Sequence, residues 1–358
     1  MNYVGVDLHQ KTSWFYVVDS CGNKLDSRNV PNTEEDLKNY FEKIPKPFTL
    51  AVESTYNWYF FVDLAEQYAE EVFLANSYEL KAFAKRHKKT DKIDARLIAN
   101  VLHRGFLPAV TIADKQTRQV RELLRYRMNL VKDRSRNIFR LKALLDKIGC
   151  YWWGDFTTYK GLRSIDTEGL PIIYVDIINR YREQIIDLSE RIEGIEKGVV
   201  DVTHRDVDMC NLLTIPGIGA FSAALIKSEI IDISRFRSFN RLCAYAGLAP
   251  RVRASADKIY YGALNTNRRK NLQWILLENV YHFIKGLDRA RKKFERIKSK
   301  KGHNTAKVSL ARDMLKVIYH VLRGKRPFYS EVDVSKKRER QSRNVRIQSV
   351  AATALSGV

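Results

Sequence analysis

The first eighty residues combine short apolar runs with turn residues and amphipathic segments. Three runs have the length and the β-branched or aromatic content of strands: Tyr3–Leu8, Trp14–Val18 and Lys24–Val30. Thr33-Glu34-Glu35-Asp36 is a helix-capping pattern that predicts a helix to about Lys43. The pattern then predicts a strand over Phe48–Glu53 and a helix over Trp58–Ala69. A second strand over Val72–Ala75 and a second helix over Asp91–His103 follow. A three-strand meander followed by helix, strand, helix, strand and helix is the order of an RNase H-like domain, so we predict an α/β domain over residues 1–110.

Helical periodicity dominates from residue 111 to residue 205. A long basic helix is predicted from Lys115 to Ile148, with one apolar seam formed by Leu124, Met128, Val131, Ile138, Leu141, Leu145 and Ile148. A second helix follows Pro171, and its apolar residues alternate steps of three and four, as in a coiled coil: Ile178, Tyr181, Ile185, Leu188, Ile192, Ile195 and Val199. We predict that the two helices pair as an antiparallel hairpin or across a dimer, with residues 149–170 as the connection. A plain layer of a helical bundle is the alternative.

The remaining chain divides into a module and a tail. Residues 206–328 are predicted to form a mainly α-helical domain. Residues 329–358 are basic and poor in apolar residues, which predicts a tail that is disordered until it binds a partner.

Charge is unevenly distributed along the chain, which has a net charge of +22. Residues 1–80 hold 6 Lys and Arg against 13 Asp and Glu, whereas residues 81–142 hold 18 against 5 and residues 250–348 hold 27 against 8. An acidic module followed by two basic regions indicates a nucleic-acid partner, with an anionic membrane surface as the weaker alternative. From the first basic region we predict nucleic-acid contacts for Lys88, Lys89, Arg125, Arg134 and Arg136.

Other features of the sequence narrow the class of protein. No apolar run is long enough to predict a transmembrane helix, and the N-terminus enters a strand pattern without the features of a signal peptide. The four cysteines are scattered and form no CxxC pair, so we predict neither a zinc site nor disulfides. These features fit a protein of a reducing cytoplasm.

Four carboxylates occupy positions that favour metal binding. Asp7 and Glu53 end two predicted strands, and the ends of neighbouring strands converge at a sheet edge. Asp91 and Asp94 share one helix face because they are three residues apart. Four clustered carboxylates repel one another unless cations neutralise them, and such oxygen ligands suit Mg²⁺ or Mn²⁺. Two such ions can hold the attacking and leaving oxygens of a phosphoryl displacement, although each residue alone has an ordinary surface role as its alternative.

Two further motifs lie in the mainly helical module. Ile215-Pro216-Gly217-Ile218-Gly219 resembles a helix-hairpin-helix loop, which would present backbone N–H groups at Gly217 and Gly219 to a phosphate. An ordinary connection between helices is the alternative. Further along, Ser255 is flanked by Arg251, Arg253 and Lys258, cations that could bind a phosphodiester and stabilise developing negative charge.

Several blocks together resemble the insertion sequence 110 family of transposases. The blocks are Gly5-Val6-Asp7, Val52-Glu53-Ser54-Thr55, Lys89-Thr90-Asp91-Lys92-Ile93-Asp94-Ala95, and Gly247-Leu248-Ala249-Pro250-Arg251 with the serine that follows it. The resemblance spans residues 3 to about 326. It implies a RuvC-like DEDD domain in which Asp7, Glu53, Asp91 and Asp94 bind Mg²⁺ or Mn²⁺, and a C-terminal transposase domain in which Ser255 is the nucleophile.

The same resemblance implies how the parts act together. The two sites would form one composite centre with domains from different subunits of a dimer or tetramer, acting on donor and target DNA with a structured non-coding bridge RNA. The chain departs from the family pattern at Ala256, Asp257, Arg268-Arg269 and Gln273, which bears on the loop geometry near Ser255. The alternatives are a site-specific DNA invertase, a metal-only nuclease in which Ser255 is idle, and a non-catalytic nucleic-acid-binding protein.

Overall fold

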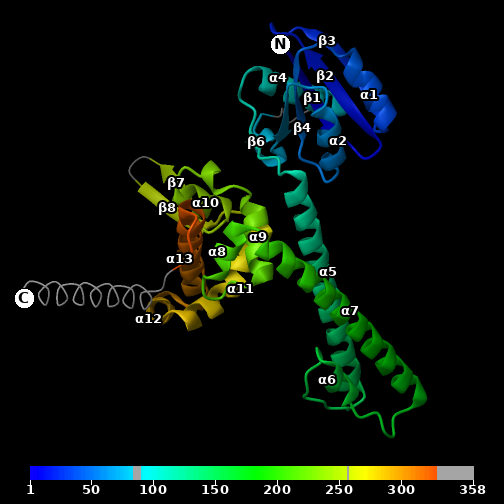
Figure 1. Ribbon diagram of the computed structural model, residues 1–358, viewed down its shortest axis with the longest axis vertical. Helices are drawn as coiled ribbons and strands as arrows, with labels where there is room; N and C mark the ends of the chain where they lie inside the picture. The colour runs from blue at the N-terminus through cyan, green and yellow to red at the C-terminus, as the bar shows by residue number, and fades with distance from the viewer. Residues whose placement is uncertain (84–89, 256–257, 329–358) are drawn as a thin grey trace, which may run out of the picture. The chain divides into compact units, whose positions relative to one another are not determined.

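The computed structural model describes residues 1–83, 90–255 and 258–328 (Figure 1). The chain divides into two compact units, the first ending at Ala113 and the second beginning at Asp114. Each unit has its own hydrophobic core. No helix among the described residues is both long and apolar enough to cross a membrane.

The first unit is built on one six-stranded mixed sheet, in the order β3-β2-β1-β4-β5-β6. The central strand β1 pairs antiparallel with β2 and parallel with β4. β3 extends the antiparallel side, while β5 pairs parallel with β4 and antiparallel with β6. The strands are β1 (Asn2–Leu8), β2 (Thr12–Val18), β3 (Lys24–Pro31), β4 (Phe48–Glu53), β5 (Glu71–Ala75) and β6 (Ala109–Val110).

Helices cover both faces of this sheet because successive strand residues point to opposite sides. Val4, Val6 and Leu8 pack with α1 and α2, together with Leu50 and Val52 of β4. The opposite face, which carries Tyr3 and Ala51, packs against α4. The helices of this unit are α1 (Glu34–Lys43), α2 (Trp58–Ala65), α3 (Ser77–Leu80) and α4 (Asp91–His103).

The α/β class predicted for the N-terminal domain is confirmed, with small differences at its elements. Helix α2 ends at Ala65 rather than Ala69, because the next residues form turns in which the amides of Tyr68 and Ala69 both donate to the Ala65 carbonyl. α3 and β6 were not predicted, since elements of four and two residues are too short to show a period. The RNase H-like assignment stays a prediction at this level of description.

Two helices of 33 residues each open the second unit: α5 (Lys115–Lys147) and α7 (Ile172–His204). They pack along each other, joined by a segment that contains α6 (Tyr159–Arg163) (Figure 1). Every seventh residue of the α7 seam is buried, namely Ile178, Ile185, Ile192 and Val199. Because α7 buries these residues against the same chain, the structure shows α5 and α7 as a helical hairpin rather than as helices that pair across a dimer. The supercoiling of a coiled coil stays a prediction.

The rest of the second unit is mainly helical, as predicted, and has one large core. It also contains a two-stranded antiparallel hairpin that the sequence did not predict. Its elements are α8 (Val207–Leu213), α9 (Ala220–Ile230), the 3-10 helix η1 (Ile233–Arg235), α10 (Phe239–Tyr245), β7 (Pro250–Ser255), β8 (Lys258–Leu264), α11 (Lys270–Gly286), α12 (Asp288–Lys301) and α13 (His303–Gly324). The predicted tail lies outside the described residues.

Candidate functional site

Strand pairing places the first two carboxylates side by side at one edge of the sheet. β1 and β4 are parallel neighbours, and Val6 of β1 lies opposite Val52 of β4. Asp7 and Glu53 are therefore the next residues on the two strands. Along each strand, the neighbours of Asp7 and Glu53 within that strand point toward α1 and α2. Because successive strand residues point to opposite faces, Asp7 and Glu53 lie on the other face, which α4 covers.

Helix α4 adds the other two carboxylates to this edge. The helix begins at Asp91, and the Thr90 hydroxyl caps it by accepting a hydrogen bond from the Ile93 amide. Asp91 and Asp94 occupy its first turn, where the positive end of the helix dipole stabilises negative charge. Asp7 and Asp91 thus come together in the first unit. Glu53 and Asp94 act on Asp7 electrostatically, but among the described residues neither joins the group of potential ligand atoms that lie within 4.8 Å of one another.

Gly5 allows the close approach of α4 to β1. A methyl group built at Gly5 would lie 2.2 Å from the Ala99 amide nitrogen and 2.3 Å from the Ala95 carbonyl oxygen, both backbone atoms of α4. Any larger residue would force the helix away from the strand. Because Ala95 directly follows Asp94, the contact at Gly5 also sets the position of the acidic end of the helix.

Burial and mutual repulsion perturb the carboxylate at the centre of the group. Asp7 is only 3% exposed. The pKa of its carboxyl is raised to about 6. Burial is the largest cause, His9 lowers the pKa in part, and the negative charges of Glu53, Asp94 and Asp91 contribute to the rise. The three acidic neighbours are therefore close enough to Asp7 to act on it electrostatically, and a bound cation would relieve that repulsion.

His9 belongs to the same group and was missed in the sequence. Its Nε2 lies 3.2 Å from Asp7 Oδ2 and 3.4 Å from Asp91 Oδ1. The backbone carbonyl of His9 accepts hydrogen bonds from the side-chain amides of Asn32 and Asn57, each at 2.8 Å, which fix the loop after β1. The available signal was its position two residues after Asp7, which returns the side chain to the same side of an extended chain.

The donor set fits a divalent cation. One potential ligand atom from each of Asp7, His9 and Asp91 can be chosen so that all three lie within 4.8 Å of one another, with Asp7 buried and the other two exposed. Carboxylate oxygens suit Mg²⁺ and Mn²⁺, and an imidazole nitrogen is also acceptable to Mn²⁺.

The second predicted site maps to the β7–β8 hairpin of the other unit. Ser255 ends β7 and lies opposite Lys258, the first residue of β8. Arg253 pairs with Tyr260 in the same hairpin. The structure gives the backbone of these residues, while the side chains of Ser255, Arg253 and Lys258 lie outside what it describes.

Comparison with known proteins gives matches over both units. The transposase model DEDD_Tnp_IS110 matches residues 4–150, and the model for the transposase IS116/IS110/IS902 family matches residues 209–295. The chain belongs to the IS110 family of transposases. It is thus a DNA transposase or recombinase.

Curated relatives of this transposase cover most of its length. It is similar to the transposase for insertion sequence element IS1328 of Yersinia enterocolitica, with 26% identity over 80% of this chain and 84% of the relative. The transposase for IS1111A of Coxiella burnetii is 24% identical over 70% of each chain. The pilin gene-inverting protein of Moraxella bovis is 30% identical over 43% of this chain and 48% of its own length.

The residues in which this transposase departs from the family pattern have structural contacts beside the hairpin. The Arg269 side chain donates a hydrogen bond of 2.7 Å to the Tyr245 hydroxyl, and Gln273 donates one of 2.7 Å to the Gly247 carbonyl. The aliphatic part of Arg268 covers Gly247, which has a positive φ of 70°. These contacts tie the start of α11 to the end of α10 and so hold the two elements that flank the hairpin. Ala256 and Asp257 lie outside the described residues.

Four of the arginines predicted to contact nucleic acid have partners within the chain. Arg125 pairs with Glu122 at 2.7 Å, Arg136 with Asp133 at 2.9 Å, and Arg134 donates to the Ser189 hydroxyl at 3.3 Å. Arg251 donates to the Thr266 hydroxyl. Lys88 and Lys89 lie outside the described residues. Nucleic-acid contacts by this set stay a prediction.

The two glycines of the predicted helix-hairpin-helix loop lie in different surroundings. Gly217 has a φ of 86°, and an added methyl group would lie 2.8 Å from both the His282 Cβ and the Phe283 amide of α11. Gly217 is therefore required for packing, whatever else it does. Gly219 is exposed and precedes α9, with open space around it. Of the two, Gly219 has the geometry to present its amide to a phosphate.

Gly5→Ala should impair both stability and metal binding in this transposase. The added methyl group must displace α4, which costs about 1–3 kcal/mol of stability and moves Asp91 and Asp94 away from Asp7. Gly194→Ala is the matched control, since Gly194 lies in α7 with nothing within 4 Å of an added methyl group. Urea unfolding and Mn²⁺ titration would measure the two effects, and a Gly5→Ala protein with wild-type stability and Mn²⁺ affinity would disprove the positioning role.

Proposed function

We propose that the chain cuts and rejoins DNA with a divalent-metal site formed by Asp7, Glu53, Asp91 and Asp94 and with Ser255 as the nucleophile. The observation that carries the proposal is the electrostatic effect of three carboxylates, those of Glu53, Asp91 and Asp94, on the buried Asp7. Strand order supports an RNase H-like, RuvC-like assignment, because an antiparallel three-strand meander followed by two parallel strands is the order predicted for that fold. The match of the DEDD transposase model to residues 4–150 adds support.

The proposed chemistry is a pair of transesterifications. The Ser255 hydroxyl oxygen attacks a DNA phosphorus, the bond from phosphorus to the 3′-oxygen breaks, and the serine proton leaves with that oxygen. The product is a phosphoserine link and a free 3′-hydroxyl. A 3′-hydroxyl of another strand then attacks the phosphoserine, which reforms a phosphodiester and returns the proton to Ser255.

The protein groups have separate parts in this chemistry. A divalent ion, when bound, would supply positive charge to the phosphate oxygens. Asp7, Glu53, Asp91 and Asp94 would hold that ion, and Arg251, Arg253 and Lys258 would bind the phosphate near Ser255. Donor and target DNA, a structured non-coding bridge RNA and a second copy of the chain are the proposed partners, with the basic regions binding nucleic acid through its backbone.

DNA inversion is the second candidate function. The similarity to the pilin gene-inverting protein of Moraxella bovis favours it, since that relative has the highest identity among those described above. The proposed chemistry would be the same, and the arrangement of the recognised DNA sites would differ. A plasmid with two sites in inverted orientation would separate inversion of the intervening DNA from insertion into a new target.

Glu53→Gln and Asp94→Asn should each lower the rate of DNA strand cleavage by at least about 100-fold, because each removes one negative ligand from the metal site. Glu70→Gln is the matched control, an exposed acidic residue of the same unit outside the carboxylate group. Cleavage of labelled DNA in Mg²⁺ would be measured together with DNA binding in EDTA. Wild-type cleavage by both tetrad variants would overturn the metal-site proposal.

A further inference from the structure

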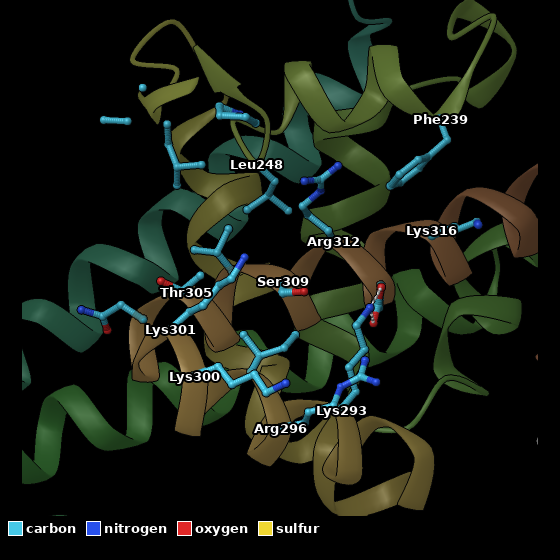
Figure 2. Close-up of a pocket in the computed structure, with 18 residues that line it drawn as sticks. Phe239, Leu248, Lys293, Arg296, Lys300, Lys301, Thr305, Ser309, Arg312 and Lys316 are labelled. Atoms are coloured by element: carbon cyan, nitrogen blue, oxygen red, sulfur yellow. Dashed lines mark hydrogen bonds and ion pairs between the residues drawn. The ribbon is translucent and has the colours of Figure 1, made fainter. Parts of the chain in front are cut away.

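An open cleft in the second unit lies outside both proposed catalytic groups. Its volume is about 940 Å³, and its walls are α12, α13, the start of α10 and the base of the β7–β8 hairpin (Figure 2). That volume lies near the upper end of the roughly 300–1,000 Å³ typical of pockets that bind a small organic molecule. The cleft can therefore admit units of nucleotide size but is too small to enclose a double helix.

The cleft is strongly basic. Figure 2 shows positively charged side chains from both helices around it, and the full set is Lys293, Arg296, Lys300, Lys301, Arg312 and Lys316. Asp313 is the single carboxylate of the lining, and it pairs with Lys293 at 2.6 Å. Within the part of the chain that the structure describes, no ion pair joins the other five cations to a carboxylate. The helix dipole stabilises cations at the C-terminal end of α12. The dipole of α13 does not explain Lys316, because this residue lies in the interior of that helix.

Apolar surface lies between these charges. Phe239 and Val308 are partly exposed and line the cleft, and the hydroxyl groups of Thr305 and Ser309 line it as well. A free phosphate would use only the cations. An unpaired nucleic-acid strand would use both features, because its phosphates would meet the cations while a sugar or base covers the apolar surface.

The position of the cleft relates it to Ser255. Pro250 and Leu264, which pair at the base of the hairpin, both line it. Ser255 lies five residues further along β7, which corresponds to roughly 16 Å at the rise of a strand. A stacked strand rises about 3.4 Å per nucleotide. Because an unpaired strand can be more extended than a stacked one, this separation spans at most about five nucleotides.

We propose that this cleft binds the backbone of an unpaired nucleic-acid strand within about five nucleotides of the phosphate that reacts at Ser255. The relation to Ser255 rests on the proposed function, whereas binding in the cleft does not depend on it. The strand is DNA or RNA, which share this backbone chemistry.

The test compares two double variants of the full-length protein with equal changes in net charge. Lys300→Ala/Lys316→Ala removes one cation of the cleft from each helix, and Lys292→Ala/Lys298→Ala removes two exposed lysines of α12 outside it. Fluorescence anisotropy would follow binding of three probes across a series of salt concentrations in EDTA: a single-stranded DNA, the same sequence as a duplex, and a single-stranded RNA. Because anisotropy measures binding and not DNA cutting, failure of the proposed chemistry would not affect this result.

The cleft variant should bind single strands about 10–30-fold more weakly at 0.1 M salt, with the slope of log affinity against log salt reduced by about 1.4. The control should change affinity by less than about 3-fold, and duplex binding should fall less than single-strand binding. A loss with only one of the two single strands would support the proposal and identify that strand as the ligand. Three results would overturn the proposal: an equal loss of affinity in the cleft and control variants, a larger loss for the duplex than for single strands, or no loss of affinity at all. In the last case, an acidic protein segment would be the next occupant to test.

Discussion

Ser255→Ala should abolish the covalent attachment of the protein to DNA. If the serine oxygen forms the bond to phosphorus, alanine removes the reacting atom. The hairpin backbone should tolerate the change, because alanine fits the extended conformation at the end of β7. DNA labelled on each side of the cut would be analysed by denaturing gel electrophoresis after reaction in Mg²⁺. Wild-type protein should produce a protein-linked band, and Ser255→Ala should produce none.

Ser299→Ala is the matched control for this loss. It makes the same substitution at an exposed serine on α12 of the same unit, and it should retain the protein-linked band. Equal rates of DNA cutting by wild type and Ser255→Ala, without any protein-linked species, would contradict the serine mechanism. That outcome would assign the chemistry to the carboxylate site alone and make the protein a metal-only nuclease.

Asp7→Asn should have opposite effects on activity and on the stability of the metal-free protein. Activity should be lost, because the central ligand of the site loses its charge. Stability should rise, because the pKa of Asp7 is raised to about 6 by burial and by its acidic neighbours, above about 3.9 in an unfolded chain. Stability linked to this group is present below pH 4 and is lost as the pH rises through 6.

The measurement is urea unfolding of wild type and Asp7→Asn between pH 4 and pH 8, in EDTA and in Mg²⁺. In EDTA above pH 6, Asp7→Asn should be more stable by about 1–3 kcal/mol, and the difference should shrink toward pH 4. Mg²⁺ should stabilise wild type and have no such effect on the variant. Glu70→Gln, which lacks these neighbours, should follow wild type. A variant less stable than wild type in EDTA at pH 7 would contradict the account of repulsion at Asp7.

The sequence predicts the carboxylate group well because local rules determine it. Alternation along Gly5-Val6-Asp7 and along Ala51-Val52-Glu53 assigns Asp7 and Glu53 to the same face of neighbouring strands. The spacing of Asp91 and Asp94 assigns both to the first turn of one helix. Strand alternation does not predict how closely helix α4 approaches β1. That distance depends on the contact of Gly5 with Ala95 and Ala99.

Other features could not be predicted because they depend on tertiary contacts. β7 alternates polar and apolar residues along Arg251-Val252-Arg253-Ala254, but Pro250 at its start and Gly262 within β8 weaken the strand pattern, so only the pairing of the two segments identifies them as strands. The apolar spacing of α7 is the same whether its partner helix belongs to the same chain or to another copy. Only the observed packing of α7 against α5 decides between the two arrangements. The basic cleft combines cations from α12 and α13 with apolar residues about fifty positions earlier, and no local pattern indicates that they meet.

Crystallographic location of Mn²⁺ by its anomalous scattering tests the central claim most directly. Crystals of the full-length protein soaked in Mn²⁺ should show an anomalous peak within coordination distance of Asp7, at about 2.0–2.2 Å from carboxylate oxygens if the ion binds as Mg²⁺ does. Glu53, Asp91 or Asp94 should supply further ligands, and crystals of Asp7→Asn should lack the peak. Saturating Mn²⁺ that gives peaks elsewhere on the protein and none at Asp7 would contradict the account.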